Sequence, residues 1–273
     1  MSESTAGLYV HVPFCAVRCD YCNFAIVAGQ DRRIPAYLEA LSHEAAVWGA
    51  RLSTLRFDTL HFGGGTPSRL TGDQIDRLIQ TLASCFSLRS GAEIALEANP
   101  EDVSPDRVRA WRAAGVTRIT VGVQSRRKQG LQSIGRPGTV HAGDQALIHL
   151  AEGGIESLGV DLIFGRPEQS VTEWSEELDE VLAMPVQHLS LYALETDGKS
   201  PLALRIERGD SAAPSSDDAA AMYEAALSQT NEAGFSHYEI SNFARPGHVS
   251  RHNLKYWTDS TVSWSGTERS FVR

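Results

Sequence analysis

The segment LYVHVPFCAVRCDYCNF, residues 8–24, joins an apolar strand to a loop that carries three of the chain's four cysteines. Cys15, Cys19 and Cys22 follow the run LYVHV directly and are separated by three and two residues. Such a loop can wrap three thiolates around one face of an iron–sulfur cube, and three ligands for four irons leave one iron open. The segment therefore predicts a cluster with an open coordination position at the end of the first strand.

Zinc is the main alternative for these cysteines. A structural zinc site usually takes four protein ligands in two separated pairs, and no second Cys/His pair follows at finger spacing, although a non-protein fourth ligand would remove that objection. Cys85 stands alone, which is a poor layout for a disulfide framework. Three unrelated buried cysteines form the third interpretation, and their clustering in a cysteine-poor chain argues against it.

Short β-type runs alternate with helical patterns along the chain. Strands are expected at residues 8–12, 59–65, 93–98, 118–123, 157–164 and 188–194. Helices are expected at residues 35–52, 71–86, 104–115, 172–184 and 219–233. Repeated strand–helix units predict an α/β fold with a parallel sheet, either a (β/α) barrel or an open doubly wound sheet.

Composition limits the class of protein. A chain of 273 residues with 42% hydrophobic content can bury a substantial core as one main domain. The net charge of -9 argues against a protein that works by neutralising nucleic-acid phosphates. No stretch reaches the roughly 18 apolar residues of a membrane span, and the N-terminus lacks a signal-peptide pattern, so we expect a cytoplasmic protein.

Polar and glycine residues gather where the predicted strands end. The motif GGGTP, residues 63–67, allows close backbone approach to a ligand, which Thr66 can hydrogen-bond, although an ordinary tight turn would look the same. Glu97 and Gln124 close the third and fourth strands and should project at the same rim. Asp161 lies inside the apolar run LGVDLIF, where a carboxylate needs a partner, and Arg136 is the nearest candidate. A structural salt bridge is the alternative for these side chains.

The cysteine spacing, with Tyr21 before the last cysteine, resembles the signature of the radical-SAM superfamily. The segments HFGGGTPS, LEANPE, GVQS, VDLIFGRP, LSLYAL and YEISNFARPGHVSRHNLKYW resemble the oxygen-independent coproporphyrinogen III oxidase-like family, particularly its heme-chaperone branch. The resemblance runs from about Leu8 to Trp257. It implies a partial (β/α)6 TIM-like barrel, a [4Fe–4S] cluster on the three cysteines, and S-adenosylmethionine (SAM) bound across the C-terminal ends of the strands.

The resemblance also implies which side chains contact SAM or its neighbouring site. The matching positions are Tyr9, Tyr21, Gly64, Gly65, Thr66, Glu97, Gln124, Arg136, Asp161 and Ala193. For Tyr9, Tyr21 and Ala193, simple core packing is the alternative. In the mechanism that the family implies, the cluster donates one electron to SAM and cleaves its C–S bond.

Phe24 separates the two branches of the family. Authentic oxidases carry a further cysteine two residues after the third, and here that position is Phe24. The chaperone branch is thought to bind heme and pass it on, so the implied partners are heme or porphyrin, a heme-acceptor protein and an electron donor. His252, close to Tyr256 and Trp257, matches a motif of that branch and is a candidate axial heme ligand, with His248 as a rival.

The pattern breaks near the end of the chain. We expect residues 1–195 to form the barrel core and residues 196–273 to form a covering segment and a truncated remnant of the family's C-terminal domain. A largely missing domain argues against coproporphyrinogen oxidase turnover, so the oxidase and an inactive remnant are alternatives to the chaperone. Two smaller departures are Arg126-Arg127 in place of the usual Phe-Asp, and Arg166 in place of the usual leucine.

Overall fold

A parallel sheet of six strands forms the centre of the computed structural model, which describes residues 5–196, 198–212, 215–258 and 261–265. These strands are β1 (Ala6–Val12), β4 (Phe57–Gly64), β5 (Leu88–Ala98), β6 (Arg118–Gln124), β7 (Ser157–Phe164) and β8 (His188–Ala193). They pair in that order, each parallel to the next. All six predicted strands are confirmed, and so is the partial (β/α)6 barrel.

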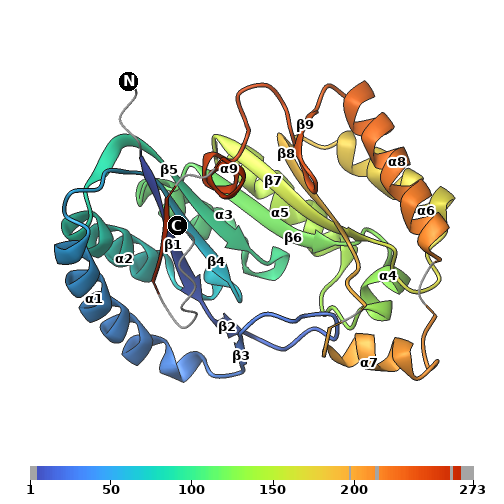
Figure 1. Cartoon of the computed structure of the whole chain (residues 1–273), viewed down its shortest axis with the longest axis horizontal. Helices are drawn as coiled ribbons and strands as arrows, with labels where there is room; N and C mark the ends of the chain where they lie inside the picture. Colours follow the sequence, from blue (N-terminus) through green and yellow to red (C-terminus); the bar gives the residue numbers. More distant parts are fainter. Residues whose placement is uncertain (1–4, 197, 213–214, 259–260, 266–273) are drawn as a thin grey trace.

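Helices follow the strands and flank the sheet, from α1 and α2 at one end to α6 and α8 at the other (Figure 1). The long helices are α1 (Ile34–Arg51), α2 (Gly72–Cys85), α3 (Pro105–Ala113), α5 (Val140–Glu152), α6 (Val171–Leu182) and α8 (Ser216–Glu232). The predicted starts of α2 and α3 are confirmed, because Thr71 and Gln74 form a capping box and Ser104 accepts from the Arg107 N–H. Within the described ranges, no helix is both long and apolar enough to cross a membrane.

The core lies between the sheet and these helices. Six of the seven residues of β1 and seven of the eight residues of β7 are buried, as expected for strands covered on both faces. Trp111 of α3 and Trp174 of α6 are fully buried against this layer. Burial of two such aromatic side chains fixes the helices on the sheet, which in turn sets the loops at the strand ends.

Three further strands extend the sheet at its edges. β10 (Asn242–Ala244) pairs antiparallel with β8, β9 (Ser236–Glu239) pairs with β10, and β11 (Val262–Ser265) pairs parallel with β1. The sequence gives no clear pattern for β11 because it is only four residues long. Beyond residue 265 the expected remnant lies outside the described residues.

Residues 196–218 contain a helix that the sequence pattern did not predict. α7 (Pro201–Glu207) begins at the Ser200 cap and packs Leu202 onto a small apolar cluster. Its Leu202 N–H donates to the Asp20 carbonyl at 2.9 Å, and Arg205 pairs with the Asp20 carboxylate at 2.6 Å. α7 therefore supports the cysteine loop. The division at residue 195 stays a prediction.

Candidate functional site

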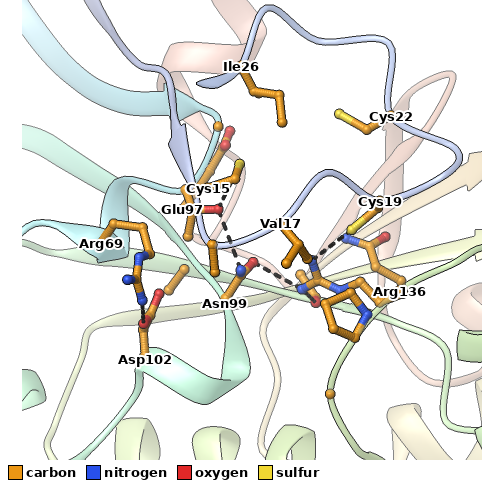
Figure 2. Close-up of a pocket in the computed structure, with 18 of the residues that line it drawn as sticks. Cys15, Val17, Cys19, Cys22, Ile26, Arg69, Glu97, Asn99, Asp102 and Arg136 are labelled. Atoms are coloured by element: carbon orange, nitrogen blue, oxygen red, sulfur yellow. Dashed lines mark hydrogen bonds and ion pairs between the residues drawn. The ribbon is translucent and has the colours of Figure 1, made fainter. Parts of the chain in front are cut away.

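A cavity of about 260 Å³ opens where the parallel strands end, and all three cysteines of the loop line it (Figure 2). The structure brings eight further predicted residues to the same cavity: Tyr21, Gly64, Gly65, Thr66, Glu97, Gln124, Arg136 and Asp161. These side chains come from five strands or the loops that follow them, so only the fold unites them. The expectation that Glu97 and Gln124 share one rim is confirmed.

Arg18 holds the cysteine loop in shape. Its guanidinium donates to the carbonyls of Cys22, Phe24 and Ile26 at 3.1, 3.4 and 3.3 Å. At the base of the loop, the two-residue strands β2 (Phe14–Cys15) and β3 (Val27–Ala28) pair in parallel. Sequence reasoning missed Arg18, although its place between the cysteines was the available signal.

The three thiols that line the cavity form a soft donor set. Burial raises the pKa of Cys15 and of Cys22, and the neighbouring thiols raise both further. Among the described residues, no three His, Cys, Asp or Glu side chains converge at metal-binding distance. Three thiols facing one cavity suit an iron–sulfur cluster with an open iron, and loading it requires their deprotonation.

A hydrogen-bonded chain crosses the cavity between two of the cysteines. The Thr66 hydroxyl donates to Cys15 Sγ at 3.3 Å and accepts from Asn99 Nδ2 at 3.4 Å. Arg136 then donates to Asn99 Oδ1 at 3.0 Å and to Cys19 Sγ at 3.8 Å. Every donor and acceptor role is consistent, so the chain fixes the Asn99 amide orientation. Asn99 belongs to the quoted segment LEANPE but was not predicted as a site residue.

Among the described residues Arg136 forms no hydrogen bond with Asp161, although its charge acts to lower the pKa of that carboxyl. Arg136 donates instead to Asn99 and, at 2.7 Å, to the Gly122 carbonyl. Asp161 Oδ1 is buried and has no hydrogen-bond partner among the described residues. Burial and the nearby Glu97 carboxylate raise the pKa of Asp161 to about 7. Asp161 is therefore a carboxyl that titrates near neutral pH beside the cavity.

The glycine motif brings the end of β4 against the first strand. Gly64 has a φ of +106°, and a Cβ there would lie 2.5 Å from the His11 ring. A Cβ on Gly65 would lie 2.7 Å from the Pro13 carbonyl carbon. Close packing within the chain requires glycine at both positions, and their contact with a ligand stays a prediction.

A second cavity, of about 190 Å³, lies deeper in the barrel and shares Glu97 and Asp161 with the first. Tyr9 and His252 line this second cavity. His61 packs against both: its ring centroid lies 5.8 Å from that of Tyr9 and 5.0 Å from that of His252, and it hydrogen-bonds Glu97 at 3.0 Å. His61 therefore orients Glu97 from below, a role that no sequence pattern indicated.

Both ring nitrogens of His252 are engaged. Nδ1 lies 2.8 Å from Thr59 Oγ1 and Nε2 lies 3.3 Å from the Tyr256 hydroxyl, and the residue is buried. Burial holds the pKa of His252 well below its usual value. Its rival, His248, contacts Ser157 Oγ through Nδ1 at 3.3 Å.

Ala193 is the predicted residue that the structure keeps apart from the rest. It ends β8, is exposed, and is not among the described residues that line either cavity. Its contact with SAM stays a prediction.

Comparison with known proteins agrees with this geometry. The model of the Radical SAM superfamily matches residues 9–181. The heme chaperone HemW of Mycobacterium tuberculosis is 38% identical over 261 residues, which cover 92% of this chain and 65% of that protein. HemW of Lactococcus lactis is 34% identical over 257 residues, covering 94% and 67%.

A solved structure extends the comparison to the fold. The coproporphyrinogen III oxidase HemN from Escherichia coli, a radical SAM enzyme, matches with a TM-score of 0.85 and 25% identity, covering 97% of this chain and 64% of that one. The chain thus spans about two thirds of the length of these relatives. The chain belongs to the radical SAM superfamily and, within it, to the HemN-like family, on the branch that contains HemW.

Proposed function

We propose that this chain holds a [4Fe–4S] cluster on Cys15, Cys19 and Cys22 and binds SAM in the adjoining cavity. The cluster, when bound, supplies one electron for cleavage of the C–S bond of SAM. The observation that carries the proposal is that three cysteines, which no other part of the fold requires, share one cavity with the matching SAM-contact residues.

The chain's own residues have distinct tasks in this site. The glycine motif lets the backbone reach the amino group of SAM, while Glu97 and Gln124 offer polar groups at the rim. Arg136 and Thr66 donate hydrogen bonds to two of the cysteine sulfurs, which stabilises their charge when they are deprotonated.

We further propose that the protein works as a heme chaperone rather than an oxidase. Phe24 stands where the oxidases carry a further cysteine, and it is 66% exposed at the mouth of the cavity. An exposed aromatic ring suits contact with a flat apolar ligand such as heme. The partners in this proposal are heme, a heme-acceptor protein and an electron donor, and the expected location is the cytoplasm.

His252 remains a candidate heme ligand, but only if one of its present hydrogen bonds breaks. Iron could bind its imidazole only after the hydrogen bond to Thr59 or to Tyr256 is broken. The other role that fits the geometry is to support His61 and, through it, Glu97. These two roles give different results on substitution.

Metal analysis tests the cluster. Protein purified and reconstituted without oxygen should contain about four irons and four sulfides per chain. The Cys19→Ala variant should lose most of this content, whereas Cys85→Ala should not, because Cys85 lies outside the cavity. Zinc without iron or sulfide would instead favour a zinc site on these cysteines.

Heme titration tests the chaperone proposal. The protein should bind heme with a Soret band that His252→Ala shifts if this imidazole ligates iron, while a shift with His248→Ala would assign the iron to the rival histidine. An unchanged spectrum with His252→Ala removes that residue as a ligand. Decarboxylation of a porphyrinogen in the presence of SAM and a reductant would support the oxidase alternative and contradict the chaperone proposal.

A further inference from the structure

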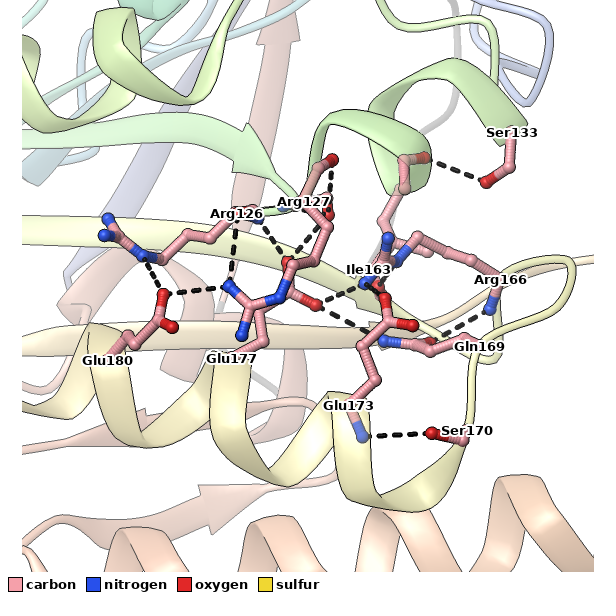
Figure 3. Close-up of polar contacts among 12 residues, drawn as sticks. Arg126, Arg127, Ser133, Ile163, Arg166, Gln169, Ser170, Glu173, Glu177 and Glu180 are labelled. Carbon is pink, nitrogen blue, oxygen red and sulfur yellow. Dashed lines mark hydrogen bonds and ion pairs between the residues drawn. The ribbon is translucent and has the colours of Figure 1, made fainter.

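Glu177 of α6 is a carboxylate without any exposed surface. Its Oε1 accepts the Ser125 hydroxyl at 2.7 Å and the backbone N–H of Arg126 (Figure 3). Its Oε2 pairs with Arg166 and accepts from Gln169 Nε2 at 3.4 Å. A fully buried glutamate is rare and needs such compensation. One side chain therefore joins the turn after β6 to the loop after β7.

Arg166 compensates the buried charge of Glu177. The guanidinium is also fully buried, and its Nε donates to the Ile163 carbonyl at 2.9 Å. Gly130 of α4 (Lys128–Ser133) makes the space, because a Cβ there would lie 1.5 Å from Arg166 Nη1. Arg166, which departs from the pattern that the sequence resembles, thus has a structural role in this ion pair.

The second departure lies at the other end of the same network. Arg126 pairs with Asp144 and, at 3.0 Å, with Glu180, and Arg127 pairs with the same Glu180 oxygen at 3.0 Å. Arg126 also offers its backbone N–H to Glu177. The two unusual sequence positions are thus coupled through α6.

Both loops held by Glu177 contain an unfavourable backbone conformation. Among the described residues other than glycine, those with positive φ are Gln124, at 65°, and Glu168, at 62°. Gln124 immediately precedes Ser125, and Glu168 lies between Arg166 and Gln169. Such conformations persist only where surrounding contacts hold them, and they concentrate at functional sites.

Gln124 connects this network to the cysteine cavity. Its side chain lines the cavity, and its Nε2 lies so close to β6 that a Cβ on Gly122 would approach it to 2.8 Å. The direction of the Gln124 side chain depends on the left-handed backbone at that residue. A turn that relaxed to negative φ would turn the amide away from its present place.

We propose that Glu177 is a positioning residue for SAM binding, because it holds the turn from Gln124 to Arg126 so that Gln124 faces the cavity. Arg166 neutralises the charge of Glu177. This inference rests on the proposed binding of SAM. It goes beyond that proposal by assigning a task to a buried side chain that lines neither cavity.

A pair of double variants separates positioning from a merely structural ion pair. Arg166→Met combined with Glu177→Met removes both charges and both acceptor oxygens. Arg166→Met combined with Glu177→Gln also removes both charges but keeps a carbonyl oxygen for Ser125 and Arg126. Both replacements are close in size to the original side chains, so the core volume is retained.

Two measurements are made on each variant. Hydrogen exchange of the Arg126 amide in the cluster-free protein should be at least about tenfold faster with methionine at position 177 and close to wild type with glutamine. The dissociation constant of SAM from the reconstituted protein should rise about tenfold or more with methionine and return to within about threefold of wild type with glutamine. Iron content should be unchanged in both.

Each outcome decides the matter. If the Glu177→Met double variant binds SAM as wild type does, Glu177 does not position the site. If wild-type protein carries the cluster but does not bind SAM, the proposed function fails, and amide exchange still shows whether Glu177 holds the turn. If the methionine variant does not fold, Ser125→Ala is used instead, because it removes one contact of Glu177 and leaves its ion pair with Arg166 intact. Hydrogen exchange of the Arg126 amide and SAM binding that are both unchanged in Ser125→Ala would overturn the proposal.

Discussion

Arg136 donates a hydrogen bond to Asn99 Oδ1 at 3.0 Å, and this contact joins two halves of a polar chain that spans the cavity (Figure 2). On one side the chain reaches Cys19 through Arg136, and on the other it reaches Cys15 through Thr66. Two of the three proposed ligands are therefore coupled before any metal is present. Such outer contacts orient ligands and commonly decide metal affinity.

Asn99→Ala should weaken this coupling. The substitution leaves the Thr66 hydroxyl and one Arg136 N–H without their partner, so the free energy of unfolding of the cluster-free protein should fall by about 1–3 kcal/mol. Iron incorporation should fall as well. Chemical denaturation and iron analysis measure the two effects. Asn23→Ala, at an exposed position in the cysteine loop, is the control. Equal stability and iron content in the two variants would argue against the role of the hydrogen-bonded chain.

Gly64→Ala should destabilise the protein more than Gly91→Ala does. Both glycines have positive φ, at 106° and 72°, so both variants incur a backbone cost of about 1 kcal/mol or more. Only at Gly64 would the new methyl meet another side chain, the His11 ring at 2.5 Å, whereas nothing lies within 4 Å of the corresponding position at Gly91. Thermal unfolding of both variants should show the larger loss for Gly64→Ala. The reverse order would mean that β4 can move away from β1 at little cost.

Acid should destabilise the protein through His188. Burial and the nearby Arg118 and His248 lower the pKa of His188 to about 3, while Tyr238 occupies its Nε2 at 2.7 Å. The unfolded chain takes up a proton near pH 6.5 and the folded chain does not, so stability is present above that pH and is lost as pH falls. The loss reaches about 1.4 kcal/mol per pH unit for this group.

His188→Gln should reduce that slope. Urea unfolding at pH 7 and pH 5 should show a smaller drop for the variant, by about 1–2 kcal/mol. Buried His252 contributes in the same direction in both proteins, so the comparison isolates His188. Parallel curves for variant and wild type would show that the pKa of His188 is the same in the folded and unfolded protein.

Asp161 should have the opposite pH dependence. Its folded-state pKa of about 7 lies above the unfolded value of 3.8, so its contribution to stability is most favourable below pH 3.8 and is lost as pH rises through 7. Asp161→Asn should therefore stabilise the cluster-free protein at pH 8 by about 2–3 kcal/mol more than at pH 5. Equal effects at both values would show that the pKa of Asp161 is not raised in the folded protein.

The strands and the cysteine site could be predicted because their signals are local. The run LYVHV and the spacing of Cys15, Cys19 and Cys22 lie within a few residues of one another, and Thr71 reports a helix start through its own sequence neighbours. The shared rim of Glu97 and Gln124 followed from the rule that parallel strands end together.

Apart from Arg18, whose contacts are local, the roles that were missed depend on long-range contacts. Arg136 lies 37 residues from Asn99, and its choice of Asn99 over Asp161 depends on how two loops pack. His61 has a role only because Tyr9 and His252 flank it in the fold. Arg166 appears in sequence as an isolated departure and becomes intelligible only beside Glu177.

Electron paramagnetic resonance of the reduced, anaerobically reconstituted protein tests the central claim most directly. Cys15, Cys19 and Cys22 leave one iron of a four-iron cluster open, so the spectrum of the reduced [4Fe–4S]⁺ cluster should change when SAM is added. A cluster whose spectrum is the same with and without SAM, or a protein that takes up zinc and no iron, would contradict it.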